Sequence, residues 1–207
     1  VHRLISSNVN APIPGSITAA NPAGARPLPS AGNIYQYVSA SDYLGSWTNF
    51  ALNIRAGARL TLVTNYGVGW ARADAAPGPG GFARNPYDLN QDWGRASPDN
   101  RHFASLSGTI GLPYALRLSP LIFVQSGSAL NITVGQDLNG DSIFNDRPGL
   151  PAGQTLPQNL IVSPYGAFDI APAGGSTIIP INYAQGPWRA TVNLRLGRTF
   201  TFGPATR

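Results

Sequence analysis

The 207-residue sequence contains no cysteine, methionine, lysine or glutamate. Without cysteine the chain has neither disulfides nor thiolate metal sites. Because lysine and glutamate are absent, all fourteen basic side chains are arginine and all nine acidic ones are aspartate. Lysine and glutamate are strong polar helix formers, so their absence disfavours helices. Glycine (24) and proline (19) are abundant instead, and both disfavour helix interiors. This composition predicts an all-β chain with long loops.

The charge balance does not indicate a nucleic-acid partner. The formal net charge is +5 and the isoelectric point is about 10.0, but the arginines are scattered singly from Arg3 to Arg207. A nucleic-acid surface usually gathers its basic residues into a patch or stripe. We therefore expect no nucleic acid among the partners.

Catalytic signals are also scarce. Only His2 and His102 are available as histidines, no Gly-x-Ser-x-Gly elbow occurs, and no histidine pair has the spacing of a zinc site. No apolar run approaches the roughly 18 residues of a membrane helix. We expect a protein that is not an enzyme.

Apolar residues recur at every second position in several stretches, which is the period of a β-strand. Between Leu52 and Trp70 the apolar side chains fall on even numbers, and the same parity returns later in the chain. The pattern predicts strands at 47–55, 58–71, 101–112, 116–126 and 188–196, a bend at Gly197-Arg198 into a strand at Thr199–Phe202, and short strands near 160–162 and 178–181.

The connections between these strands alternate in length. A Pro/Gly/Asn-rich loop or linker segment over 1–46 precedes an antiparallel strand region over 47–207, which contains long loops at 72–100 and 127–186. Short turns then lie on one side and long loops on the other, as in outer-membrane barrels. We expect a partial barrel, or a sheet with open edges.

Three tryptophans near predicted strand ends (Trp47, Trp70 and Trp188) suit an aromatic girdle at a membrane interface. The alternative is an ordinary antiparallel sheet with one buried face, which alternates in the same way and uses aromatic residues in its core. The period alone does not separate these two interpretations.

The segment Asp137–Pro148 has oxygen-bearing side chains at alternate positions. Calcium accepts about 6–8 oxygen ligands in loose geometry, so this spacing predicts a calcium site. Its ligands would be Asp137, Asn139, Asp141, the Ile143 carbonyl, Asn145 and Asp146. The loop departs from the EF-hand pattern, because its glycine comes early and Pro148 replaces the final glutamate. Plain turn formation by Asp, Asn and Gly is the alternative.

Several motifs around this loop occur together in one known family. They are Ser126-Gly127, Asn131-Ile132-Thr133, Gly135 and Asp137–Pro148, preceded by Asn85–Leu89, Asp92–Arg95 and Asp99–His102 and followed by Val192–Leu196 and Thr199-Phe200. In this order and spacing, the sequence resembles TonB-dependent outer-membrane receptors of the Oar-like kind over most of residues 80–203.

The resemblance implies a barrel segment in the bacterial outer membrane or at the cell surface. Such receptors have about 22 strands around a plug, whereas roughly six to eight strands are predicted here, without a plug or closing strand. We therefore expect an internal segment that does not transport by itself. Its open sheet edges would pair with the remainder of a larger barrel, in contact with the membrane.

The alternative is a self-assembling structural subunit. Copies of the chain would pair through their sheet edges into an extracellular β-rich filament or tube, because a head-to-tail contact that does not close produces a fibre.

Overall fold

The computed structural model describes residues 1–76, 78–97, 99–151, 158–173, 176–200 and 203. Within these residues the regular structure is β-strand, apart from the short 3-10 helix η1 (Leu89–Asp92). In the same residues, no helix has the length and apolar character needed to cross a membrane. The predicted all-β fold class is confirmed.

The chain forms two compact units, each built from three segments. The first, which we call the loop unit, comprises Val1–Gly45, Ala71–Asp99 and Ser128–Gly186; the second, the strand unit, comprises Ser46–Trp70, Asn100–Gly127 and Pro187–Arg207. The predicted long loops therefore belong to a unit of their own.

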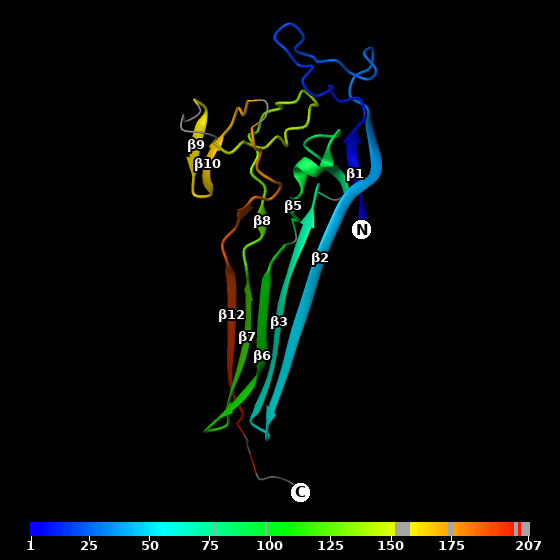
Figure 1. The fold of residues 1–207 in the computed structure, drawn as a ribbon. Coiled ribbons are helices and arrows are strands. Elements are labelled where there is room, and N and C mark those ends of the chain that lie inside the picture. The colour runs from blue at the N-terminus through cyan, green and yellow to red at the C-terminus, as the bar shows by residue number, and fades with distance from the viewer. Residues whose placement is uncertain (77, 98, 152–157, 174–175, 201–202, 204–207) are drawn as a thin grey trace. The chain divides into compact units, whose positions relative to one another are not determined.

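The strand unit contains a sheet in the order β12, β7, β6, β3 and β2. These strands are β12 (Arg189–Arg198), β7 (Leu116–Gln125), β6 (His102–Leu112), β3 (Leu60–Ala73) and β2 (Tyr35–Ala56). Each of the pairs β12–β7, β7–β6 and β6–β3 is antiparallel. The turn between β2 and β3 and the turn between β6 and β7 lie at the same end of the sheet (Figure 1).

The register divides the side chains of this sheet between two faces, because directly opposite residues in an antiparallel pair share a face. On one face Leu106 lies opposite Ile122, and Ile122 lies opposite Val192. On the other face Ser105 lies opposite Phe123, and Phe123 lies opposite Thr191. Even numbers thus form an apolar face. Odd numbers form a mainly polar face, which also holds Val63, Phe103, Leu121 and Phe123.

Both edges of the sheet in the strand unit are open. β12 pairs with β7 alone among the described strands. On the far side, β1 (His2–Asn8) pairs with β2 only between Tyr35 and Asp42, so residues 46–56 of β2 have no outer neighbour in the described chain. The predicted open edges are confirmed.

Aromatic rings form a row on the apolar face. Phe50 stacks on Tyr66, Tyr66 on His102, and His102 on Trp188, with ring centroids 5.9–6.3 Å apart. Trp188 is therefore on the face that a girdle requires. Trp47 is not: its ring fills the space over Gly67 on the polar face, so the girdle prediction is wrong for that residue.

The loop unit is built from short strands. Besides β1 they are β4 (Gly78–Phe82), β5 (Gly94–Arg95), β8 (Ala129–Leu130), β9 (Leu160–Ser163), β10 (Gly166–Asp169) and β11 (Ala184–Gln185). β1 runs antiparallel to β2 and parallel to β4. Its buried apolar clusters are small, with Ile5, Ala75 and Ala83 in one and Ala71, Ala73 and Ala96 in the other.

Several element boundaries differ from the sequence predictions. The predicted loop over 1–46 contains β1 and the beginning of β2, which starts at Tyr35 instead of position 47. The predicted bend at Gly197-Arg198 is wrong, because Gly197 pairs with Arg117 and β12 continues to Arg198. Thr199 and Phe200 form no strand, and positions 201–202 of that prediction lie outside the described residues. At 178–181 there is only a bridge at Ile178, whereas β9 confirms the strand near 160–162.

Candidate functional site

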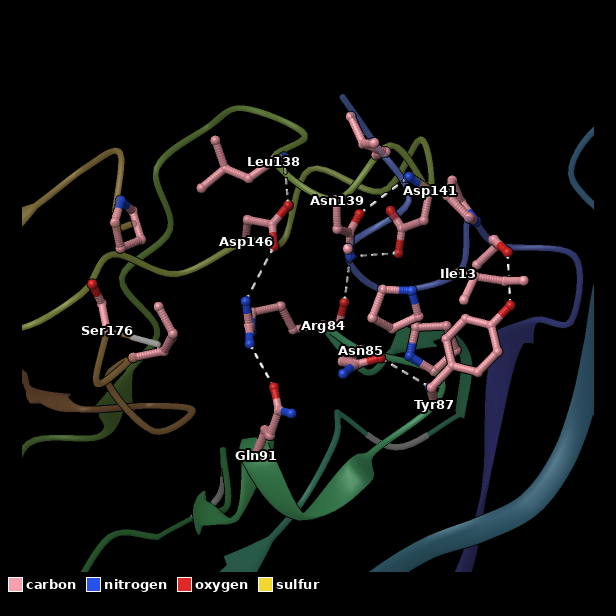
Figure 2. Close-up of a pocket in the computed structure, with 18 of the residues that line it drawn as sticks. Ile13, Arg84, Asn85, Tyr87, Gln91, Leu138, Asn139, Asp141, Asp146 and Ser176 are labelled. Atoms are coloured by element: carbon pink, nitrogen blue, oxygen red, sulfur yellow. Dashed lines mark hydrogen bonds and ion pairs between the residues drawn. The ribbon is translucent and has the colours of Figure 1, made fainter. Parts of the chain in front are cut away.

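The loop unit contains a pocket of about 750 Å³. Four parts of the chain line it: the segments 11–17, 84–91 and 138–146, and residues 172, 173, 176 and 178. We call Asp137–Pro148 the Asp/Asn loop. Figure 2 shows side chains of this loop on one side of the pocket, with Arg84 between Asp146 and Gln91. Three of the six residues predicted as metal ligands, Asn139, Asp141 and Asp146, therefore border a pocket formed with distant parts of the chain.

Asp137 holds the beginning of the Asp/Asn loop together. One carboxylate oxygen accepts the Gly140 N–H at 2.7 Å and the Asp141 N–H at 3.2 Å, and the other accepts the Ser142 N–H at 2.8 Å. Gly140 and Ser142 have positive φ angles of 71° and 66°. This is the local bonding by which Asp forms tight turns, so the turn part of the sequence interpretation is present in the structure.

Two further turns continue this pattern along the loop. Asn139 Oδ1 accepts the Asp141 N–H at 3.1 Å, and Asp141 Oδ1 accepts the Ile143 N–H at 2.8 Å. Ile143, predicted as a carbonyl ligand, thus contributes its N–H to a carboxylate. The loop curls so that its side-chain oxygens point toward its own backbone.

Amide side chains attach the loop to distant segments. Asn139 Nδ2 donates to the Arg84 carbonyl at 2.6 Å, and Asn145 Nδ2 donates to the Phe82 carbonyl at 3.0 Å. On another side, Asn8 Nδ2 donates to the Asp141 carbonyl at 3.2 Å. The loop is therefore fixed to the N-terminal segment and to the segment after β4.

Asp146 closes the loop from its far end. Its Oδ2 accepts the Leu138 N–H at 2.7 Å. Its Oδ1 is buried and accepts no hydrogen bond within the described chain, and Arg84 Nη1 lies 3.7 Å away. Burial raises the pKa of this carboxyl, while the Leu138 N–H and the Arg84 charge lower it. One buried oxygen of Asp146 thus remains poorly compensated.

Asp141 is the second carboxyl in this loop whose ionised form is destabilised. The loop lies outside the long strands of the sheet. Its pKa is raised to about 6, chiefly by burial and in part by the charges of Asp137 and Asp146. Hydrogen bonds from Ile143 and Asn139 act in the opposite direction. The charges of Asp137 and Asp146 therefore oppose ionisation of Asp141.

The structure brings the six predicted ligands into one loop but does not arrange them around one point. Among the described residues, no three Asp or His side chains converge closely enough to hold a metal ion. Within residues 137–148, two buried oxygens accept no hydrogen bond from the described chain, Asn145 Oδ1 and Asp146 Oδ1. The calcium site stays a prediction.

A buried ion pair beside the pocket was not predicted from the sequence. Arg147 and Asp92 have side chains that are 2% and 1% exposed, and an Arg147 Nη2–Asp92 Oδ1 bond joins them. Arg147 Nε also donates to the Ile179 carbonyl at 2.8 Å, and Asp92 Oδ2 accepts the Arg84 N–H at 2.6 Å. The pair thus links η1, the end of the Asp/Asn loop and residue 179. The sequence offers no local pattern for this pair, because 55 residues separate the two partners. The opposite charges of the two side chains are the only sequence signal for it.

The fold and its exposed apolar face define a class of protein. A sheet with open edges, strands of ten or eleven residues and apolar side chains along one exposed face is the arrangement of strands in an outer-membrane barrel. The sequence matches the family model of the outer membrane beta barrel domain over residues 1–206, and the chain belongs to this family. It is a protein of the bacterial outer membrane. No curated protein and no solved structure matches it.

We predict that Asp92→Asn and Arg147→Met each destabilise the loop unit by roughly 3–5 kcal/mol, because each leaves one buried charge without its partner. The double variant should lose less than the sum of the two. Urea unfolding can be followed by the fluorescence of Trp93, which adjoins Asp92. For this purpose the other three tryptophans are replaced by phenylalanine in every variant. As a control, Asp42→Asn at the exposed His2–Asp42 pair should change stability by about 1 kcal/mol or less. Additive losses at positions 92 and 147 would contradict direct pairing.

A second prediction concerns pH. The folded-state pKa of Asp141 is raised from 3.8 to about 6, so its contribution to stability is fully present below pH 3.8 and is lost as the pH rises through about 6. In buffer with EDTA, the loop unit should therefore become less stable over this range. Asp141→Asn should flatten the slope, measured with the same Trp93 reporter. An unchanged slope in the variant would show that Asp141 does not titrate in this way.

Proposed function

We propose that this chain is a barrel segment of an outer-membrane protein related to TonB-dependent receptors, and that it cannot transport by itself. The observation that carries the proposal is the sheet in the strand unit, which has one exposed apolar face and two unpaired edges. The motifs from Asn85 to Asp146 support the receptor relationship. The role is structural, with no catalytic step.

The apolar face fits lipid rather than water. Leu52, Val192 and Leu194 are 57%, 59% and 65% exposed, although they lie in the middle of regular strands. A soluble sheet buries such a face against another layer. The ten or eleven residues of β6, β7 and β12 match a tilted crossing of the hydrocarbon layer.

The open edges explain why the segment does not transport by itself. Small membrane barrels close with about eight strands, and the strand unit contributes five to its sheet. Within hydrocarbon, the unpaired N–H and C=O groups of β12 and β2 each require a partner. We propose that the remaining strands of a larger barrel supply those partners, with the loop unit outside the membrane.

The second candidate function is a self-assembling subunit of an extracellular filament or tube. The same observation favours it, because β12 and residues 46–56 of β2 are two different edges of one sheet. Pairing β12 of one copy with β2 of the next is a head-to-tail contact, which repeats without limit unless the rotation closes. The two candidates differ in what surrounds the apolar face.

Refolding the chain with and without detergent distinguishes these candidates. We expect a β-type circular dichroism spectrum only when micelles are present, because they cover the apolar face. Asparagine at positions 192, 194 and 196 should abolish micelle-dependent folding, and asparagine at the polar-face positions 191 and 195 should not. Ordered filaments in plain buffer, seen by electron microscopy, would favour the second candidate. Discrete monomers in plain buffer would contradict both.

We also propose that the Asp/Asn loop binds calcium. The carboxylates of Asp137, Asp141 and Asp146 would supply negative charge, and Asn139, Asn145 and the Ile143 carbonyl would supply neutral oxygens. The raised pKa of Asp141 and the unpaired buried oxygens of Asn145 and Asp146 support this proposal, because a cation would compensate all three. The bound ion would brace the loop against the repulsion among its aspartates.

The calcium proposal predicts stabilisation of the loop unit at neutral pH. Calcium at 100 times its dissociation constant should add about 2.7 kcal/mol relative to EDTA, measured through Trp93. Magnesium should stabilise less, because it requires tighter octahedral geometry. Asp141→Asn should remove most of the calcium effect, and Asp88→Asn, outside the Asp/Asn loop, should retain it. Equal stability in calcium and EDTA would contradict the site.

A further inference from the structure

The charges of the chain are divided between its two units. All nine aspartates lie in the segments of the loop unit. The segments of the strand unit contain eight of the fourteen arginines and no acidic residue. The strand unit therefore carries only positive side-chain charge, and the position of these arginines determines which solutes it attracts.

Four of these arginines lie at the turn end of the polar face. Arg117 is opposite Gly111 on one side and opposite Gly197 on the other. Gly111 in turn donates its N–H to the Arg59 carbonyl at 2.6 Å. This places Arg59, Gly111, Arg117 and Gly197 in one row across β3, β6, β7 and β12, with arginine and glycine alternating.

Arg195 and Arg55 complete the cluster. Arg195 is opposite Ser119, two positions from the Arg117–Gly197 pair, so it is the diagonal neighbour of Arg117, at about 7–8 Å between Cα atoms. Arg55 has the same parity along β2 as Asn49, whose side chain lies over Gly67 on the polar face. Arg55 is one residue before the end of β2 and Arg195 is three residues before the end of β12. These two strand ends lie at the end of the sheet where β2 turns into β3 (Figure 1). We call Arg55, Arg59, Arg117 and Arg195 the arginine cluster.

The four arginines of the cluster are exposed. Within the described residues no carboxylate forms an ion pair with any of the four. Gly197 leaves open space on one side of Arg117, since a side chain added at Gly197 would meet nothing within 4 Å. Four like charges thus gather on one face without an ion-pair partner among the residues that the structure describes.

We propose that the arginine cluster binds a free oxyanion of the phosphate or carboxylate class on the polar face of the barrel wall. Guanidinium groups form paired hydrogen bonds with such anions, and several of them can converge on one multivalent ion. Solute is the expected source, because lipid contacts the opposite, apolar face. The inference goes beyond the proposed function: it needs the barrel sheet alone, and neither the receptor relationship nor calcium.

The test is titration of inorganic pyrophosphate into the full chain, refolded in phosphatidylcholine nanodiscs at low salt and followed by calorimetry. The wild type should bind saturably, and the affinity should fall as salt screens the charges. Arg117→Gln combined with Arg195→Gln should weaken binding about tenfold or more, because charge-assisted hydrogen bonds are lost. Arg117→Lys should lose part of the affinity, because it keeps the charge and loses the planar fork.

Two single variants serve as matched controls. Arg198→Gln removes an arginine at the same end but on the other face, and Arg189→Gln removes one from the same face at the opposite end. Each should keep pyrophosphate affinity within about twofold of the wild type. Circular dichroism of every variant in nanodiscs establishes that the sheet has formed, which also separates this test from failure of the barrel assignment.

Three results would overturn the proposal. The first is absence of saturable pyrophosphate binding by a folded wild type. The second is an equal loss of affinity in the control variants, which would indicate general electrostatic attraction. The third is competition by lipid: if nanodiscs of phosphatidylglycerol abolish pyrophosphate binding, the cluster contacts headgroups instead of free solute.

Discussion

The structure of this chain depends on one constraint: backbone N–H and C=O groups inside a lipid bilayer must find partners within the protein. β3, β6 and β7 meet it, since each has a hydrogen-bonded neighbour on both sides. Among the described strands, β12 and residues 46–56 of β2 meet it on one side only. The sheet is therefore complete in its interior and open at its edges, which is the basis of our proposal that the chain is a segment of a larger barrel.

The loop unit is stabilised by a different set of interactions. Its apolar clusters are small and consist largely of alanine, so burial of apolar surface contributes little to its stability. Hydrogen bonds and charges connect its segments instead, with Asn10 donating to three carbonyl groups and Arg147 joined to Asp92. A unit held in this way depends on the complete satisfaction of buried polar groups. For this reason, the charges and hydrogen bonds around the buried carboxylates of Asp141 and Asp146 affect the stability of the whole unit.

The sequence predicted the strand unit well and the loop unit poorly, for a physical reason. In the sheet, the alternation of apolar and polar residues directly records which face each residue occupies, so β6 and β7 were located within about one residue. β1 has no such alternation, and its pairing with β2 and β4 depends on residues 27 or more positions away. For the same reason, the turns made by Asp137 were predictable from local sequence, while the attachment of Asn139 to Arg84 and the Arg147–Asp92 pair were not.

The central claim is that the even-numbered face of the sheet contacts lipid. Because the chain has no cysteine, single cysteines at positions 192, 193, 194 and 195 can each carry a spin label in the refolded protein. Accessibility to oxygen, which concentrates in the bilayer, and to a water-soluble nickel complex then reports the surroundings of each position. The account predicts alternation, with 192 and 194 accessible to oxygen and 193 and 195 to nickel. Uniform access to nickel at all four positions would contradict it.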